Sequence, residues 1–391
     1  MMHSRPQFNS ITKALTGALV LCLGQAASAA EVAPYFHSWG GSLNDAKQSA
    51  GMNSAILAFA VTNGSCALVP DLMNKLADAR TYVGSGGQLM ISFGGQNGVY
   101  AEIACKDDDQ LFNLMEKLMS DANTRRFDFD IEGQQLKDVE GTARRARVLA
   151  RLQAKYPDLY VSFTLPGWLR GFSTDSMNLL NTSVAAGVRI DMVNVMTMSF
   201  GVENLRTMVS PSTVGEASLT TFRAAANQMA SVFRGKTQGQ LHAMMGITPM
   251  IGKNDDGSTF TLDDAQMVAN FVRQNGVGLI SYWSFQRDRA QSSNGSTNLA
   301  SFSGVAQTDF QFYNIFKSSG GAVAAAATPA PAPAQAAVVA GSCSAGSWNQ
   351  GKQYAAGSIV SYQDNKMYVA KFANPGYNPT ISTYYWSQYF C

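Results

Sequence analysis

Residues 127–133 read FDFDIEG, and three acidic residues alternate there with three bulky apolar ones. Side chains along a β-strand point to opposite faces in turn. A strand over this stretch therefore places Asp128, Asp130 and Glu132 on one face and the apolar residues on the other. We expect the apolar face to pack on helices and the acidic face to point into a barrel, toward its C-terminal mouth.

Three carboxyl groups within about 13 Å cannot all remain ionised in a poorly hydrated interior. We expect some of them to share protons, and the outermost one, Glu132, to have a raised pKa. A carboxyl group that keeps its proton near neutral pH is suited to general acid catalysis.

Two other interpretations of this stretch are a solvent-facing edge strand and a calcium loop. Asp128, Asp130 and Gly133 match the first, third and sixth positions of an EF-hand, but the twelfth position is Val139 instead of the required Glu.

Outward from this strand, short apolar runs alternate with amphipathic stretches such as Leu111–Ala122, Arg144–Lys155 and Leu262–Gln274. The strand-like runs are Val32–Phe36, Ala55–Ala60, Gln88–Phe93, Phe127–Glu132, Tyr160–Leu165, Met192–Met198, His242–Thr248 and Leu279–Ser284. This alternation predicts an α/β protein with a (β/α)8 TIM barrel over residues 31–317. In that fold, chemistry is located at the C-terminal ends of the strands.

The composition excludes several classes of protein. Lys+Arg 29 and Asp+Glu 27 give a net charge of +2, so we expect no nucleic-acid partner. The mean hydropathy of −0.07 excludes a multi-span membrane protein. Of the three histidines, His3 lies in a segment that we expect to be removed, which leaves only His37 and His242 for a metal site or a catalytic triad. We expect no metal and no cofactor.

Residues 1–30 are predicted to be a signal peptide. Arg5 and Lys13 precede a short apolar run over Ala14–Leu23, and Ala27-Ser28-Ala29 is a small-residue cleavage signal. The alternative is a buried N-terminal helix. We therefore expect a secreted, extracellular protein with no membrane partner, and a monomer.

Cys22 lies inside the predicted signal peptide, and four other cysteines follow it. Four cysteines allow three pairings. Their spacing suggests Cys66 with Cys105 and Cys343 with Cys391. In the loop-entropy model, the loop closed by the second disulfide would stabilise the folded state by about 4 kcal/mol. Four free thiols are the alternative, which export disfavours.

The chain beyond residue 317 changes in character. Residues 318–342 are rich in alanine and proline and carry no charge or aromatic residue, which predicts an extended linker. Residues 343–391 are rich in aromatic side chains, which are too many for so small a core and which stack on sugar faces when exposed. The aromatic residues there are Trp348, Tyr354, Tyr362, Tyr368, Phe372, Tyr377, Tyr384, Tyr385, Trp386, Tyr389 and Phe390.

The acidic stretch resembles the DxxDxDxE signature of family 18 glycoside hydrolases, the chitinase family. Four other stretches are similar to strands of that family in the same order: APYF at 33–36, SFGG at 92–95, VNVMTM at 193–198 and TPMIG at 248–252. Tyr282-Trp283-Ser284 resembles the eighth strand, whose tryptophan forms the floor of the sugar site. The resemblance covers most of residues 31–317.

The resemblance implies a retaining, substrate-assisted hydrolysis of chitin. Glu132 would protonate the glycosidic oxygen, and the acetamide of the substrate would attack the anomeric carbon to form an oxazolinium ion. Asp130 would orient that acetamide, and Asp128 would lie behind it and share its proton. Trp283 would stack on the sugar ring. Chitin or N-acetylglucosamine oligomers would be the partners.

The chain departs from the family pattern in two places. Arg125 replaces the first Asp of the signature, where a cation could lower the pKa of Asp128. At the sixth strand the family commonly has Met-x-Tyr-Asp, and this chain has Met196, Thr197, Met198 and Ser199. Losing one oriented polar contact there lowers a catalytic rate by about 10- to 1000-fold.

Further sugar contacts are expected after the fifth strand, at Trp168, and after the seventh, at Asn254 and Asp255. For each of these, a purely structural role in its loop is equally consistent with the sequence. His37 is equally consistent with a structural histidine and with a sugar contact.

The C-terminal residues resemble small all-β chitin- and cellulose-binding modules, with Trp348, Phe372, Tyr377, Tyr385 and Trp386 as the candidate binding face. A purely structural aromatic core is the alternative. For the whole chain we expect a chitinase; the alternatives are an endo-β-N-acetylglucosaminidase of the same family and a catalytically weak chitin-binding lectin.

Overall fold

The structure is a computed structural model. It describes residues 29–201, 211–291 and 297–318, and, near the C-terminus, 346–349, 351–355, 357–364, 366–370, 374, 376, 378–380 and 385–389. The predicted signal peptide lies outside the described residues except for its last two positions, and the predicted linker lies outside them except for Ser318. The predicted disulfide between Cys343 and Cys391 also lies outside the described residues. Within the described part of the chain, no helix is both long and apolar enough to cross a bilayer.

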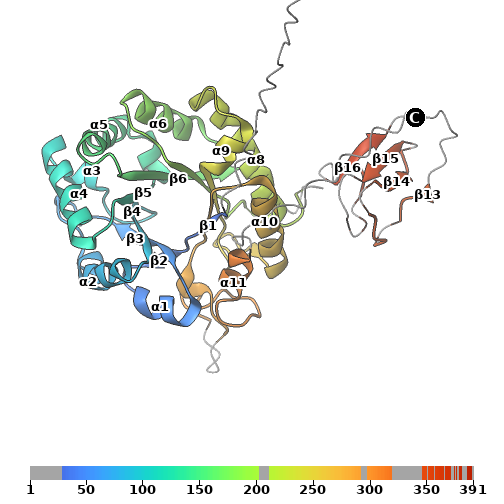
Figure 1. The fold of residues 1–391 in the computed structure, drawn as a ribbon, viewed down its shortest axis with the longest axis horizontal. Coiled ribbons are helices and arrows are strands. Elements are labelled where there is room, and N and C mark those ends of the chain that lie inside the picture. Colours follow the sequence, from blue (N-terminus) through green and yellow to red (C-terminus); the bar gives the residue numbers. More distant parts are fainter. Residues whose placement is uncertain are drawn as a thin grey trace, which may run out of the picture.

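The described residues between 29 and 318 form a curled parallel sheet surrounded by helices (Figure 1). The strands of this sheet are β1 (Glu31–Val32), β2 (Tyr35–His37), β3 (Ser54–Ala60), β4 (Gln88–Gly94), β5 (Arg126–Asp130), β6 (Tyr160–Trp168), β8 (Met192–Met196), β9 (Met245–Thr248) and β12 (Leu279–Ile280), with β7 (Gly171–Phe172) antiparallel to β6. The neighbour order is β1-β12-β9-β8-β6-β5-β4-β3-β2.

The helices that cover the outside of this sheet follow the strands in the chain. They are α1 (Leu43–Ala50), α2 (Pro70–Gly84), α3 (Ala101–Ala104), α4 (Asp108–Ala122), α5 (Val139–Lys155), α6 (Thr174–Ala185), α8 (Val214–Val232), α9 (Gln238–Ala243), α10 (Leu262–Asn275) and α11 (Gln311–Lys317), with 3-10 turns η1 (Gly133–Lys137) and η2 (Phe285–Arg287). A short antiparallel pair, β10 (Gly252–Lys253) and β11 (Thr259–Phe260), follows β9. The expected alternation of strands and helices is confirmed as a TIM-barrel-like fold.

The two ends of this sheet belong to one run of chain. β1 pairs with β12, and β2, only two residues further on, pairs with β3. Pro34 lies between β1 and β2 and interrupts the strand, because it has no backbone N–H to donate. Its carbonyl still accepts a hydrogen bond from the amide of Ile56 at 2.9 Å. The run at 31–37 thereby hydrogen-bonds to the last strand on one side and to the second on the other.

Several predicted strand limits were wrong at their ends. His242 is in α9, which begins at a capping box formed by Thr237 and Gln240. β8 ends at Met196 because the chain turns at Ser199, whose φ is 51°. Of the strand-like run at 279–284, only Leu279–Ile280 forms strand β12, although the amides of Ser281 and Trp283 still donate to the carbonyls of Ile247 and Pro249 at 3.0 Å.

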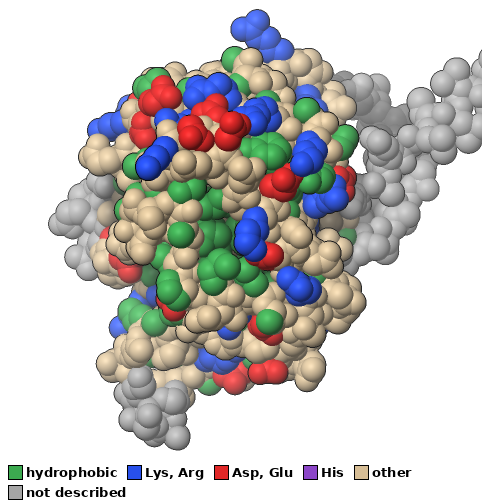
Figure 2. Space-filling view, turned by 90° about the vertical axis from the view of Figure 1, so that its left-hand side faces the viewer, with side chains coloured by type: hydrophobic (Ala, Val, Ile, Leu, Met, Phe, Trp, Pro, Cys, Tyr) green, Lys and Arg blue, Asp and Glu red, His purple; other side chains and the backbone are tan. Residues whose placement is uncertain are grey.

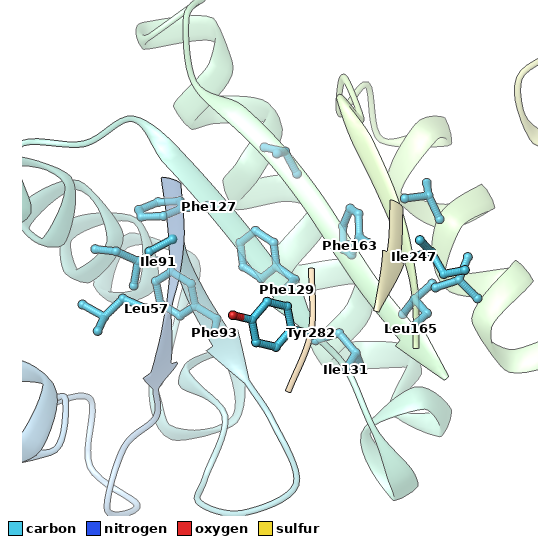
Figure 3. Close-up of a cluster of buried hydrophobic side chains, with 14 of the residues drawn as sticks. Leu57, Ile91, Phe93, Phe127, Phe129, Ile131, Phe163, Leu165, Ile247 and Tyr282 are labelled. Atoms are coloured by element: carbon cyan, nitrogen blue, oxygen red, sulfur yellow. The ribbon is translucent and has the colours of Figure 1, made fainter. Parts of the chain in front are cut away.

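The apolar core lies between the sheet and the helices. Figure 3 shows Phe127, Phe129 and Ile131 together with Leu57, Phe93, Phe163 and Ile247 in this layer. Phe93 stacks on Phe129 with ring centroids 5.3 Å apart. The predicted apolar face of the acidic strand is therefore the face that packs on the helices.

A disulfide joins Cys66 to Cys105, as expected from their spacing. It links the loop before α2 to the end of α3. Beside it, a hollow of about 520 Å³ lies between α2 and α4 and is lined mainly by apolar side chains such as Leu68, Met73 and Leu114. Figure 2 shows apolar side chains gathered on this face of the molecule, below a band of charged ones.

The C-terminal described residues form a separate four-stranded sheet. Its strands are β13 (Gly346–Ser347), β14 (Ile359–Ser361), β15 (Met367–Ala370) and β16 (Trp386–Tyr389), paired in that order. Its small core contains Tyr354, Val360, Tyr368, Ala370 and Trp386. An all-β region therefore exists where the sequence predicted one.

Asp288, directly after η2, holds the C-terminal part of the barrel together. Its carboxylate is fully buried and accepts hydrogen bonds from the Tyr282 hydroxyl at 3.2 Å, the Gln307 amide at 2.7 Å, and the backbone amides of Phe312 at 3.1 Å and Tyr313 at 2.7 Å. One side chain thus connects the last strand to α11.

We predict that Asp288→Ala lowers the free energy of unfolding by about 3–5 kcal/mol, because it leaves several buried donors without an acceptor. Urea denaturation followed by circular dichroism measures this difference. Asp309→Ala is the matched control, because the exposed Asp309 accepts one hydrogen bond, from the amide of Ala290. A loss below about 1 kcal/mol for the Asp288 variant, as is usual at surface positions, would contradict the role of this carboxylate.

Candidate active site

Three carboxyl groups lie at the C-terminal end of β5, inside the curled sheet. Asp128 and Asp130 are buried on the side of the strand opposite to Phe127 and Phe129. In the parallel ladders, Asp128 is level with Ser92 of β4 and Ser162 of β6, and Asp130 is level with Gly94 and Thr164. The alternation expected for this strand is confirmed for both aspartates.

Asp128 is the innermost of the three acids. Its carboxylate accepts hydrogen bonds from the hydroxyls of Tyr35 at 2.9 Å, Ser92 at 2.7 Å and Thr164 at 2.8 Å. Burial raises the pKa of Asp128, and these hydrogen bonds oppose that rise. The donors come from three different strands, so the carboxylate is held at a fixed position in the barrel.

The hydrogen-bond network continues from Thr164 to the neighbouring strands. The side-chain amide of Asn194 donates to the Thr164 hydroxyl at 3.1 Å, and the Thr248 hydroxyl donates to Asn194 Oδ1 at 2.8 Å. All three side chains are buried. A continuous polar layer thus crosses the barrel from β9 to β5, beneath the mouth.

Asp130 lies above Asp128 and has fewer partners. Its Oδ1 is buried with no hydrogen-bond partner among the described residues. Burial, and then the nearby charges of Glu132 and Asp128, raise its pKa well above the ordinary value. Asp130 therefore ionises less readily than an ordinary aspartate, and its Oδ1 is available to a ligand above it.

Glu132 lies nearest the solvent, and the predicted strand limit was wrong here. β5 ends at Asp130, and Glu132 is the residue before η1, with an extended backbone at φ −129° and ψ 162°. Gly133, with a φ of 57°, makes the turn into η1. The half-buried Glu132 carboxyl has a pKa raised by burial, which is the direction expected for a general acid.

Most of the predicted sugar-contacting residues line one cavity together with two of these acids. The cavity has a volume of about 360 Å³. From the predicted set, it brings together Asp130, Glu132, Trp168, Met196, Met198, Ser199, Asp255 and Trp283. These residues come from β5, β6, β8, the loop after β9 and the end of the β12 run, so the cavity opens at the C-terminal ends of the strands, as expected for this fold.

An aromatic wall forms one side of the cavity. The Trp283 ring lies 5.7 Å from the Phe59 ring at an interplanar angle of 12°, and Tyr35 is 6.0 Å from Trp283. A second hollow of about 350 Å³ shares Phe59, Gln96 and Trp283 with the first and extends to Trp39. Trp39 is 55% exposed and Trp168 is 51% exposed, so broad apolar surfaces lie at both cavities.

Asn254 and His37 do not line this cavity. The Asn254 side chain donates to the carbonyls of Met250 and Gly252 and accepts from the amide of Ser199 at 3.1 Å, so it holds its own loop. His37 lies between Trp39 and Trp283 at ring distances of 4.6 and 4.7 Å. Burial and the nearby Arg287 charge lower the His37 pKa to about 4, so the ring is neutral at pH 7.

The expectation that Arg125 could lower the pKa of Asp128 was wrong. Arg125 lies before the start of β5, pairs with Asp158 at 2.8 Å and stacks on Tyr156 at 4.5 Å. The pKa of Asp128 is raised instead, and burial is the main cause. Arg125 lies at the N-terminal end of β5, whereas the mouth of the barrel lies at the C-terminal end.

Sequence reasoning missed several residues of the site. Tyr35, Phe59, Gln96, Thr248 and Met250 line the cavity but were not candidates. Tyr35 could have been found from the alternation of faces, because it stands two residues after Ala33 in the run at 31–37 and both belong to the same interior cluster. Gln96 directly follows the quoted SFGG stretch. Thr248 and Met250 lie in the quoted TPMIG stretch, whereas nothing in the sequence marks Phe59.

Of the aromatic residues predicted for the C-terminal binding face, the structure describes Trp348, Tyr385 and Trp386. Trp386 is 1% exposed and packs on Tyr354 at 5.3 Å, so its ring belongs to the core of the sheet and not to a binding face. Trp348 and Tyr385 are partly buried against that core. Phe372 and Tyr377 lie outside the described residues.

A half-buried acid with a raised pKa, a second carboxyl beneath it and a flat aromatic wall are the elements of a sugar-cleaving site; the class of protein is a glycoside hydrolase. Residues 31–250, more than half of the chain, match the family described as Glycosyl hydrolases family 18. The chain belongs to that family.

Two relatives are similar to this chain over its barrel region. A probable bifunctional chitinase/lysozyme of Escherichia coli (strain K12) is 31% identical over 223 residues, which are 55% of this chain and 24% of that protein. Endochitinase 11 of Metarhizium anisopliae is 29% identical over 249 residues, which are 61% of this chain and 48% of that protein. The aligned region spans less than half the length of either relative.

The fold is similar to that of active domain 2 of the chitinase from Pyrococcus furiosus. Catalytic-site mutants of that domain superpose with a TM-score of 0.65 at 27% identity, over 76% of this chain and 99% of theirs. Mutants of the same domain complexed with chito-oligosaccharides give a TM-score of 0.64 at 27% identity, over 76% of this chain and 97% of theirs. These comparisons support a chitinase-like hydrolase.

We predict that Asp130→Asn stabilises the fold at neutral pH. Because the pKa of Asp130 is raised on folding, its proton stabilises the folded state below the unfolded pKa near 4, and that contribution is lost as the pH rises through the folded pKa. The variant has no such charge to bury, so its melting temperature should rise by on the order of 3 °C at pH 7.

Calorimetry at pH 7 and at about pH 3.5 checks this prediction, and the difference from the wild type should shrink at the lower pH. Asp255→Asn, an exposed carboxylate on the same cavity, should shift the melting temperature by less than about 1 °C. A lower melting temperature for Asp130→Asn at pH 7 would show that the buried carboxyl group does not destabilise the folded state.

Proposed function

We propose that this protein is a secreted chitinase that hydrolyses β-1,4 linkages between N-acetylglucosamine units with retention of configuration. One observation carries the proposal: the acid Glu132 and the buried Asp130 line the same cavity as the aromatic face of Trp283. A sugar stacked on that face has its glycosidic bond within reach of a proton donor.

In the first step, Glu132 gives its proton to the glycosidic oxygen, and the bond between that oxygen and the anomeric carbon breaks. The carbonyl oxygen of the substrate's own acetamide forms a bond to the same carbon, which gives an oxazolinium ion. The free Oδ1 of Asp130 accepts the acetamide N–H and offsets the positive charge that develops there.

In the second step, Glu132 is a carboxylate and takes a proton from a water molecule, whose oxygen attacks the anomeric carbon. The oxazolinium ring opens, and two inversions at one carbon leave the configuration unchanged. Asp128 stays behind Asp130 throughout and shares its proton, while the hydroxyls of Tyr35, Ser92 and Thr164 hold Asp128 in place.

The remaining parts of the chain fit an exported, chitin-associated enzyme. The disulfide between Cys66 and Cys105 is of a kind that persists in oxidising compartments, which supports the proposed signal peptide. The C-terminal sheet, with its aromatic residues, would be a tethered chitin-binding module. We propose that the protein acts as a monomer.

We predict that Glu132→Gln abolishes hydrolysis of chito-oligosaccharides and leaves their binding intact, because the amide keeps the shape of the side chain but has no acidic proton to donate. Product analysis by chromatography measures cleavage, and isothermal titration measures binding. Glu140→Gln, an exposed position on α5, is the control and should retain full activity.

Cleavage by Glu132→Gln at the wild-type rate would contradict the proposed role of this residue. Absence of cleavage by the wild type, with binding intact, would instead favour a chitin-binding lectin, and Ser199 and Met198 at the sixth-strand positions would be its structural basis. Cleavage only of a high-mannose glycoprotein would favour an endo-β-N-acetylglucosaminidase.

We predict that a chain ending at Ser318 degrades insoluble chitin about tenfold more slowly than the full chain at low substrate, because tethering raises the effective concentration of the enzyme at the polymer. Turnover of soluble oligosaccharides should not change, since the truncated chain keeps every described residue of the barrel. Release of soluble sugar from chitin powder measures the effect. Equal rates on the powder would contradict the tethering role.

A further inference from the structure

Tyr100 lies behind the catalytic acids without lining their cavity. It is 3% exposed, in the loop between β4 and α3. Its hydroxyl is 2.9 Å from the carbonyl oxygen of Gly95 and 3.0 Å from that of Asp130, and it accepts a hydrogen bond from the amide of Glu132 at 3.2 Å. One phenol therefore contacts the backbone on both sides of Ile131.

The hydrogen bond from the Glu132 amide to Tyr100 lies directly after the last backbone hydrogen bond between this segment and β6. Up to Ile131, the backbone follows the ladder, and the Ile131 amide still donates to Thr164 of β6 at 3.1 Å. The next amide, that of Glu132, donates to the Tyr100 hydroxyl. Tyr100 thus does for Glu132 what a neighbouring strand does for the residues before it.

The close approach of this phenol depends on Gly94. A Cβ atom there would lie 2.1 Å from the Asp130 carbonyl oxygen and 3.0 Å from the Tyr100 ring, and the φ of 102° also favours glycine. The absence of a side chain lets the loop after β4 press against the end of β5.

The loop that carries Tyr100 is fixed from three sides. Val99 exchanges backbone hydrogen bonds with Thr62 at 2.9 and 3.2 Å. The Cys66–Cys105 disulfide holds the end of α3. From α5, Arg144 donates to the carbonyls of Glu102 and Cys105, and Arg145 forms a buried ion pair with the Glu102 carboxylate. The phenol is therefore a rigid support.

We propose that Tyr100 is a positioning residue, whose hydroxyl fixes the backbone of Glu132 and so the direction from which its carboxyl reaches the cavity. The inference rests on the proposed function of Glu132 as the acid. Tyr100 acts through the main chain, because it does not line the cavity that the sugar would fill.

The test is Tyr100→Phe, which removes the hydroxyl and keeps the ring. We expect kcat on chito-oligosaccharides to fall by about 10- to 100-fold with KM within about twofold, since a small displacement of an acid lowers the rate of a step it must reach. A Glu132 carboxyl that is held less deeply is better hydrated, so the alkaline limb of the pH–kcat profile should move to lower pH.

Several titratable groups lie near Glu132. Asp130 lies beneath Glu132, Asp128 lies deeper, Tyr100 is at its amide, and Asp255 shares its cavity. Because the variant changes none of the three carboxylates, a shift of the limb reports on the position of Glu132. The titration of Glu132 is also measured directly, by carboxyl 13C NMR, with the signal assigned by its loss in Glu132→Gln.

Tyr82→Phe is the matched control. Tyr82 is also a buried tyrosine whose hydroxyl donates to a backbone carbonyl, that of Met52 at 3.0 Å, but it belongs to α2 and does not line the cavity. We expect this variant to lose stability comparable to that of Tyr100→Phe and to keep both the wild-type kcat and the Glu132 titration.

The outcomes separate the two proposals. A wild-type kcat and an unchanged Glu132 titration in Tyr100→Phe would overturn the positioning role, as would equal shifts in Tyr82→Phe. If the wild type does not turn over chito-oligosaccharides, the proposed function fails; the NMR titration then still decides whether the Tyr100 hydroxyl sets the environment of Glu132.

Discussion

The burial of several carboxyl groups in one small space is the constraint on which the rest of this structure depends. β5 sends aromatic rings outward into the helix layer and aspartates inward, so the strand cannot be buried on one face without burying acids on the other. Three hydroxyls gathered around Asp128 offset part of that cost. Asp130 is not surrounded by hydroxyls in this way, and burial, together with the charges of Glu132 and Asp128, raises its pKa.

The neighbouring strand makes room for this arrangement. A side chain at Gly94 would collide with the Asp130 carbonyl, and one at Gly95 would approach the Phe59 ring within 2.7 Å. The two glycines let β4, β5 and the aromatic wall converge within one layer of the barrel. The SFGG stretch is thus explained by packing around the acids, since neither glycine has a side chain with which to bind a sugar.

Much of this could be predicted from the sequence because it follows from local pattern. Alternation placed Asp128 and Asp130 inside and Phe127 and Phe129 outside, and the strand and helix runs gave the TIM-barrel-like fold. The strand ends were less predictable, because a capping box and single turns decided them. Tyr100 and Phe59 could not be found, because their roles arise from contacts between strands that are distant in sequence. Trp386 was predicted to lie on a binding face but is buried, because composition does not show which rings fill a small core.

The pairing of β1 with β12 has a consequence for how the molecule is made. Among the described strands of the curled sheet, β1 is synthesised first, and it lacks its partner β12 until the last of them has been made; the amides that Asp288 binds are made later still. Contacts of such long sequence separation form slowly. The curled sheet therefore has an open edge while the segment between β1 and β12 is being synthesised, and the cavity that contains Asp130 and Glu132 is complete only after Trp283 has been added.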